Sequence, residues 1–266
     1  MKTPLLSFLF FLVIFGACIS DRQPASAVDY SLLVNPFIGT DFTGNTYPGA
    51  QAPFGMVQLS PDNGLPGWDR ISGYYYPDST IAGFSHTHLS GTGAGDLYDI
   101  SYMPVTLPYR EAEAPLGIHS KFRHSDEEAS AGYYRVLLKD YNINVELTAT
   151  ERCGIQRYTF PKAQSAVFLN LKKAMNWDFT QDSHIEVVDS CTIQGYRFSD
   201  GWARGQRVFF RTRFSKPFRS SEIDTTAIIQ DGKTIGTAYV ARFNFDTTDG
   251  EEIVLCTALS GVSMEG

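Results

Sequence analysis

The sequence predicts an all-β protein, a two-sheet antiparallel β-sandwich, and three features carry that prediction. Several segments alternate apolar and polar residues, which is the pattern of strands with one buried face. Clusters of Asp and Gly separate these segments, as in the turns between antiparallel strands. No window repeats apolar residues with a helical period over three turns. Many short strands at regular spacing are typical of a sandwich or a barrel.

The alternation is clearest from Ile143 to Thr150 (INVELTAT), where apolar and polar residues change places at every step. Further strands are expected where β-branched and aromatic residues gather, at 165–171, 184–188, 207–214, 237–245 and 252–259. The turns are expected at Asp200-Gly201, Asp231-Gly232-Lys233 and Asp249-Gly250. These segments account for the predicted sandwich.

The first residues have the layout of a secretory signal peptide over 1–18: a charged start, an apolar run from Leu5 to Phe15, then Gly-Ala-Cys. The run is too short for a transmembrane helix, which needs about 20 residues. Small residues before Cys18 resemble a lipobox, so Cys18 is predicted to carry a lipid; the alternative is an ordinary signal peptide that contains a Cys. Residues 19–30 are predicted to form a flexible tether and 31–266 the folded domain.

Charge and cysteine content exclude some classes of protein. The formal net charge is −7 and no Lys/Arg cluster is present, which argues against a nucleic-acid partner. Cys153, Cys191 and Cys256 show no C-x-x-C spacing, so neither a zinc site nor a redox motif is indicated. Cys153 and Cys256 lie in apolar runs and are expected to be buried structural thiols.

Residues 35–95 differ from the rest because they are dense in Gly and Pro and contain long irregular stretches. Such loops are uncommon in a compact domain unless they are functional, which places the predicted site here. The loop at 34–62 either holds backbone amides against a ligand or is a structural crossover. The run Gly91 to Gly95 is not a nucleotide-binding loop, because a strand-like segment follows it and not a helix.

Trp68 is the strongest single candidate in this region. Its neighbours Gly67 and Asp69 give it no apolar run to belong to, so a core position is disfavoured. An exposed indole can pack against the C–H face of a sugar ring. The alternative is a tryptophan that caps the edge of the sandwich.

His86, His88 and Asp96 lie in the motif FSHTHLSGTGAGD. The two histidines are expected in a polar network or in contact with substrate; metal ligation and a buried structural role are the alternatives. No third metal ligand is identifiable, and calcium prefers oxygen ligands. Carboxylates are plentiful nearby, but their spacing singles out no catalytic pair, so neither a general acid nor a general base is assigned.

Six stretches occur in the order found in glycoside hydrolase family 92, which the chain resembles from about Val34 to Gly266. They are VNPFIGTD, GNTYPGAQAPFGMVQLSPD, SGYYYPDSTIAGFSHTHLSGTGAGD, FRHSDEEASAGYYRV, TERCGIQRYTFP and ALSGVSMEG. The sequence departs from the family at Asn45, where many relatives carry His, and at Ala131, where Pro is frequent.

The resemblance implies a β-sandwich of the supersandwich type that packs on an (α/α)6 barrel, with the active site between the two domains. It implies an inverting exo-α-mannosidase, often specific for α-1,2 links, that trims mannose-terminated glycans such as N-glycans. A calcium ion would bind the mannose hydroxyls. By motif, Gly67, Trp68 and Asp69 match the loop beside the terminal mannose, and His86, His88 and Asp96 match the histidine-rich motif near the interface.

The family's acid, base and calcium ligands lie in the barrel, so these 266 residues are expected to be inactive alone. The competing hypotheses are a stand-alone carbohydrate-binding surface lipoprotein without catalysis and, third, a structural domain that docks a helical partner. Export to the periplasm or to the outer-membrane or cell surface is expected, with the membrane contacted only through the lipid on Cys18.

Overall fold

The computed structural model describes residues 28–114, 116–173 and 175–265. The predicted signal peptide, Cys18 and nearly all of the tether lie outside the described residues. The chain divides into one unit that ends at Tyr30 and a second that spans Ser31–Gly266, and the second contains all of the described strands.

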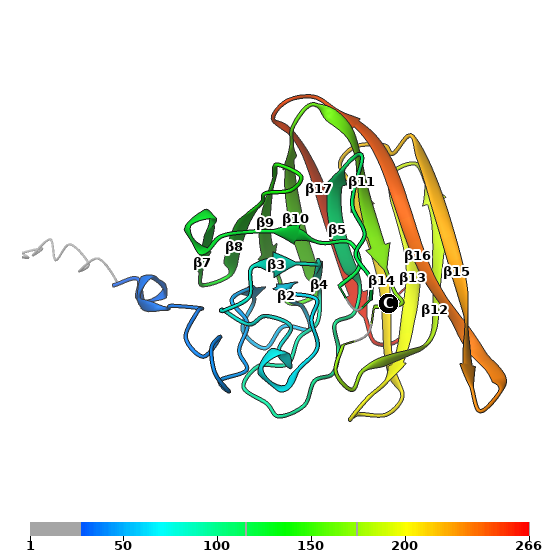
Figure 1. The fold of residues 1–266 in the computed structure, drawn as a ribbon, viewed down its shortest axis with the longest axis horizontal. Helices are drawn as coiled ribbons and strands as arrows, with labels where there is room; N and C mark the ends of the chain where they lie inside the picture. Colours follow the sequence, from blue (N-terminus) through cyan, green and yellow to red (C-terminus); the bar gives the residue numbers. More distant parts are fainter. Residues whose placement is uncertain (1–27, 115, 174, 266) are drawn as a thin grey trace, which may run out of the picture. The chain divides into compact units, whose positions relative to one another are not determined.

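The second unit is built from two large antiparallel sheets, which confirms the predicted all-β sandwich (Figure 1). The seven-stranded sheet consists, in spatial order, of β1 (Ala50–Gln51), β2 (Gln58–Asp62), β4 (Gly83–Ser85), β5 (Ser101–Thr106), β11 (Ala163–Asn170), β16 (Lys233–Thr247) and β15 (Ser220–Gln230).

The eight-stranded sheet consists of β12 (Phe179–Asp189), β13 (Thr192–Asp200), β14 (Gln206–Phe214), β17 (Glu251–Ser260), β10 (Cys153–Phe160), β9 (Ile143–Ala149), β8 (Tyr133–Leu138) and β7 (Glu127–Ser130). A small ribbon joins β3 (Thr80–Ile81) to β6 (Ser120–Lys121). The described helices are the short 3-10 turns η1 (Tyr30–Leu33), η2 (Trp68–Arg70) and η3 (His124–Asp126).

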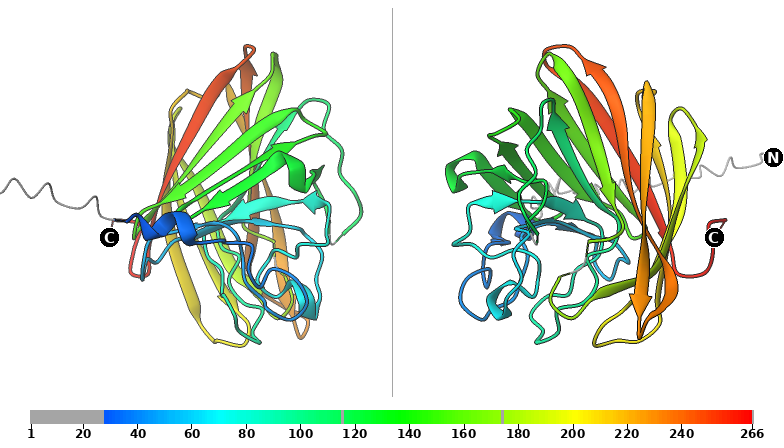
Figure 2. Two further views of the ribbon diagram at one scale, coloured as in Figure 1. Left: turned by 90° about the vertical axis from the view of Figure 1, so that its left-hand side faces the viewer. Right: turned by 45° about the vertical axis from the view of Figure 1, so that its right-hand side comes forward.

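The core lies between the sheets because each strand turns alternate residues inward. In β9, Ile143, Val145 and Leu147 are buried, while the residues between them are partly exposed. Phe243 of β16 and Phe214 of β14 meet across the core with ring centroids 5.3 Å apart. Figure 2 shows the two layers from further sides, with the short strands and loops before β5 (blue to cyan) gathered beside them.

The prediction that Cys153 and Cys256 are buried is wrong. Cys256 is exposed and Cys153 is partly exposed, because both occupy outward positions in their strands. The apolar residues around them suggested burial, but side chains in a strand point alternately to its two faces. The inward positions of β10 and β17 are held by residues such as Tyr158 and Leu255, and the cysteines face outward.

Within the described residues, no helix has the length and the apolar character needed to span a bilayer.

Candidate functional site

The loop around Trp68 presents this side chain to solvent. Trp68 opens η2 and its side chain is 55% exposed, so it is not a core residue. Gly67 precedes it with φ of +150°, a backbone conformation that residues with a side chain rarely adopt. Arg70 closes the turn, and its guanidinium makes two hydrogen bonds to the Asp78 carboxylate, each 2.6 Å long. The local sequence therefore fixes an exposed indole on a rigid turn.

A second tryptophan, Trp177, packs edge-on against Trp68, with ring centroids 6.0 Å apart. Asn176 holds this pair together, because its Oδ1 accepts a 2.9 Å hydrogen bond from the Gly67 backbone N–H. A Cβ on Gly95 would lie 2.6 Å from the Asn176 side chain, so the chain at Gly95 approaches as closely as a glycine permits. Trp177 is 46% exposed and its indole also reaches solvent.

A third tryptophan, Trp202, is held by Asp96, the residue that follows Gly95. The buried Asp96 carboxylate accepts hydrogen bonds from the backbone N–H groups of Trp202 (2.9 Å) and Ala203 (2.7 Å). Gly201 packs so closely that a Cβ there would lie 2.2 Å from an Asp96 oxygen. We call Trp68, Trp177 and Trp202 the tryptophan rim; they are all three tryptophans of the chain, and each is exposed.

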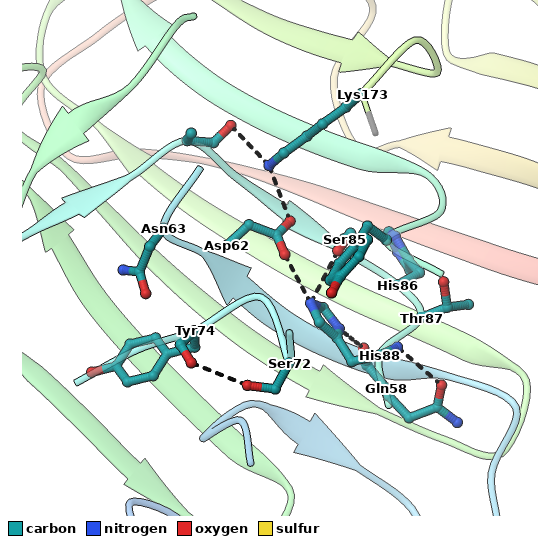
Figure 3. A network of polar contacts seen from close by, with 12 residues as sticks. Gln58, Asp62, Asn63, Ser72, Tyr74, Ser85, His86, Thr87, His88 and Lys173 are labelled. Carbon is teal, nitrogen blue, oxygen red and sulfur yellow. Dashed lines mark hydrogen bonds and ion pairs between the residues drawn. The ribbon is translucent and has the colours of Figure 1, made fainter. Parts of the chain in front are cut away.

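His88 belongs to a buried polar network that also includes Gln58, Asp62 and Lys173 (Figure 3). Its Nδ1 donates to the Gln58 carbonyl at 2.7 Å, and its Nε2 lies 3.0 Å from Asp62 Oδ1. Lys173 Nζ approaches the other Asp62 oxygen at 3.2 Å. Burial alone would raise the pKa of Asp62, but Lys173, then His88, lower it to about 2. This network ties β2 to the histidine-rich motif and to the loop after β11.

His86 is fully buried beside the core. Its Nδ1 donates to the Ile100 carbonyl at 2.7 Å, and its ring meets Tyr102 edge-on. Burial is the main cause that lowers the pKa of His86 to about 4, although the hydrogen bond to Ile100 opposes it. His86 is therefore neutral in the folded protein at neutral pH.

The pKa of His86 makes stability depend on pH. Below the ordinary pKa of 6.5, the unfolded chain takes up a proton that the folded chain excludes down to about pH 4. We expect this group to lower the free energy of unfolding by about 3 kcal/mol as the pH falls from 6.5 to 4, with no further loss below. Urea unfolding of the wild-type protein and of His86→Gln between pH 6.5 and 4 measures this contribution. If the free energy of unfolding depends on pH equally in both proteins, the prediction is contradicted.

A buried ion cluster lies beneath Trp177. Arg197 of β13 is 1% exposed, and its guanidinium pairs with Asp99 (2.6 Å) and with Asp178, the residue after Trp177. Its Nε also donates to the Leu171 carbonyl. Burial raises the pKa of Asp178 to about 6 against the opposing charge of Arg197, and the nearby Asp99 adds to the increase. One buried cation thus holds two carboxylates from separate loops.

The structure brings Gly67 and Trp68 close to the segment that precedes Asp96, because Asn176 contacts both Gly67 and Gly95, and Asp69 is half-buried next to Trp68. It places His86 and His88 in the interior, where their nitrogens serve internal partners, so they support the loops and offer no surface for a ligand. Both histidines follow β4, which ends at Ser85.

Sequence reasoning missed Trp177 and Trp202. A signal existed in MNWDF and DGWARG, where a tryptophan stands among polar or small residues, as in the loop of Trp68.

The described residues do not fit a calcium site. No group of three His, Cys, Asp or Glu side chains that could hold a metal occurs among them. Asp96 accepts hydrogen bonds from backbone N–H groups, and Asp99 and Asp178 pair with Arg197. Asp178 Oδ1 is buried without a hydrogen-bond partner, but one free oxygen falls well short of the roughly six to eight oxygen ligands that calcium takes.

Exposed tryptophans on the loops of an antiparallel β-sandwich are side chains that can pack against a sugar ring. The model of the glycosyl hydrolase family 92 N-terminal domain matches residues 33–260, and the chain belongs to this family.

Solved structures show the same relationship. A family 92 alpha-mannosidase of Bacteroides thetaiotaomicron, solved with mannoimidazole, is 35% identical over 88% of this chain, with a TM-score of 0.80. An inverting mannosidase of the same family from that species, 24% identical over 91% of the chain, shares the fold with a TM-score of 0.70. The chain covers 33% of each of these two structures.

A curated relative from Arthroderma benhamiae, described as an uncharacterized secreted glycosidase, is 28% identical over 138 residues. The match covers 48% of this chain and 17% of that protein. The chain therefore spans only a minor part of the proteins to which it is similar.

Proposed function

We propose that this chain is the N-terminal, sugar-contacting domain of an inverting exo-α-mannosidase that removes mannose from mannose-terminated glycans, including α-1,2 links. The tryptophan rim is the observation that carries the proposal. A family 92 relative with 35% identity is an alpha-mannosidase solved with mannoimidazole, which supports mannose as the sugar.

The rim has the chemistry that a sugar requires. Indole faces pack against the C–H groups of a pyranose, and nearby polar groups bind its hydroxyls. Trp68 and Trp177 stand at 77° to each other, so a ring on one indole would meet the edge of the other. Asp69, half-buried beside Trp68, is the nearest candidate for a hydroxyl contact.

Hydrolysis with inversion needs an acid and a base on opposite sides of the bond, about 6.5–9.5 Å apart. Near the rim, Asp96, Asp99 and Asp178 are buried and held by internal hydrogen bonds. We therefore place the acid, the base and the calcium ligands in the (α/α)6 barrel domain that family members carry, and we expect this chain alone to be inactive.

The test is mannose release from α-linked mannobiosides by the purified domain, with and without calcium, beside a protein that also contains the barrel. We expect release only from the two-domain protein, and only with calcium. Release by the domain alone would overturn the assignment of the catalytic groups, and Asp69 and Asp96 would then be examined first.

The alternative is a stand-alone carbohydrate-binding lipoprotein without catalysis. Exposed tryptophans are equally compatible with such a protein. It requires the domain by itself to bind mannosides tightly, whereas half of a site binds weakly. Calorimetric titration of the isolated domain separates the two. Submillimolar binding with no turnover in any longer form of the protein would favour the alternative.

We further propose export, because the Arthroderma relative is described as secreted and the first 18 residues resemble a signal peptide. A lipid on Cys18 would hold the domain at a membrane surface. The mass of the mature N-terminal peptide checks this, and an unmodified Cys18 would exclude the anchor.

A further inference from the structure

Cys153 and Cys256 lie on neighbouring strands of the eight-stranded sheet. The register between β10 and β17 places Cys153 opposite Ala258 and Ile155 opposite Cys256. The two cysteines are therefore diagonal neighbours, and both point to the outer face of the sheet. Their separation of 103 positions in sequence hides this proximity.

The two thiols interact and are accessible. Burial and then the neighbouring Cys153 thiol raise the pKa of Cys256. Cys256 is exposed and Cys153 is partly exposed, so a small oxidant can reach them. Arg213 of β14 lies directly opposite Cys256 on its other side, and the two line one groove. Arg213 does not offset the raised pKa of Cys256, so the thiolate, which is the form that attacks a disulfide, forms more readily as the pH rises.

We propose that Cys153 and Cys256 form a reversible redox pair that closes to a disulfide between β10 and β17. The oxidant is a small disulfide such as oxidised glutathione. One thiolate attacks it and releases reduced glutathione, and the second thiolate then attacks the mixed disulfide and releases another. Two protein thiols lose two electrons and two protons, and one oxidised glutathione becomes two reduced molecules.

The geometry also indicates why the bond is reversible. Diagonal neighbours in an antiparallel sheet lie about 7–8 Å apart at Cα, at or beyond the usual limit for a disulfide. Closing it requires a small shift of the two strands, and a strained, exposed disulfide is easily reduced. The bond would close a loop that contains β11 to β16. A loop of this length strongly lowers the conformational entropy of the unfolded chain, which stabilises the folded protein. Export of the protein would bring the pair into oxidising surroundings.

The test is peptide mapping of the full chain after equilibration in oxidised or reduced glutathione, followed by alkylation and trypsin. Cys153 lies in the tryptic peptide CGIQR (153–157), Cys256 in 243–266 and Cys191 in 174–197. We expect a linked peptide of 153–157 with 243–266 in most molecules after oxidation, and its loss in dithiothreitol. The oxidised protein should also melt on the order of 5 °C higher than the reduced protein.

Cys191→Ser is the matched control and should leave the linked peptide unchanged, whereas Cys153→Ser and Cys256→Ser should each abolish it. The wild-type map alone decides the proposal, so it does not depend on the variants. Recovery of both peptides only as alkylated or singly glutathionylated species after full oxidation would overturn it. A link of Cys256 to Cys191 or to a second chain would also overturn it.

Discussion

Arg197→Met is expected to lower the free energy of unfolding by about 3–5 kcal/mol, the cost of leaving buried charges without their partner. Arg197 is the cation that holds both Asp99 and Asp178 inside the domain. Methionine fills a similar volume but supplies none of the donated hydrogen bonds. The two carboxylates must then take up protons, find water or move outward.

Urea unfolding at pH 7 measures this loss. Arg135→Met is the matched control, because Arg135 pairs with Glu128 at the surface and such pairs contribute at most about 1 kcal/mol. Adding Asp99→Asn and Asp178→Asn to Arg197→Met should recover part of the stability, since no charge is then left unpaired. A loss below about 1 kcal/mol in Arg197→Met would show that the cluster does not hold these loops.

Trp68→Ala is expected to reduce mannoside turnover about 10-fold to 100-fold in a protein that contains both family domains. Removing a large apolar surface from a bound sugar costs about 1–3 kcal/mol, which corresponds to that range. The melting temperature should hardly change, because more than half of the Trp68 side chain is already exposed, at 55%.

Trp68→Phe is the matched variant, because it keeps a flat aromatic face on the same turn and should retain much of the turnover. The ratio kcat/KM for both variants, with their melting curves, completes the test. Unchanged turnover in Trp68→Ala would remove Trp68 from the sugar site. Unfolding of the variant would show that its contact with Trp177 is structural.

The strands could be predicted from the sequence where one face is buried and the other is not. Ile143–Ala149 alternates cleanly and forms β9 almost as expected. The strand expected at 237–245 forms β16 over Lys233–Thr247, because its pairing with β15 continues to Gln230 and Lys233. There both strands are largely exposed, so no alternation marks their extent.

Only the part of the candidate site that depends on neighbours in sequence could be predicted. Trp68 is marked by its immediate neighbours, and the structure confirms that it is exposed. Trp177 and Trp202 join it through contacts that the sequence does not show: Asn176 bonds Gly67 across 109 positions, and Asp96 bonds Trp202 across 106. His86 and His88 were expected in a polar network or in contact with substrate, and the structure places both in buried polar networks.

Asp96 and Asn176 hold the tryptophan rim through the backbone. Asp96 accepts hydrogen bonds from the backbone N–H groups of Trp202 and Ala203, and Asn176 accepts one from that of Gly67. None of these bonds involves an indole ring. A residue other than tryptophan at 68 or 202 would leave those anchors intact, whereas any side chain at Gly201 would collide with Asp96. The backbone anchors thus tolerate a change of the side chain at 68 or 202, whereas Gly201 cannot gain a side chain without displacing Asp96.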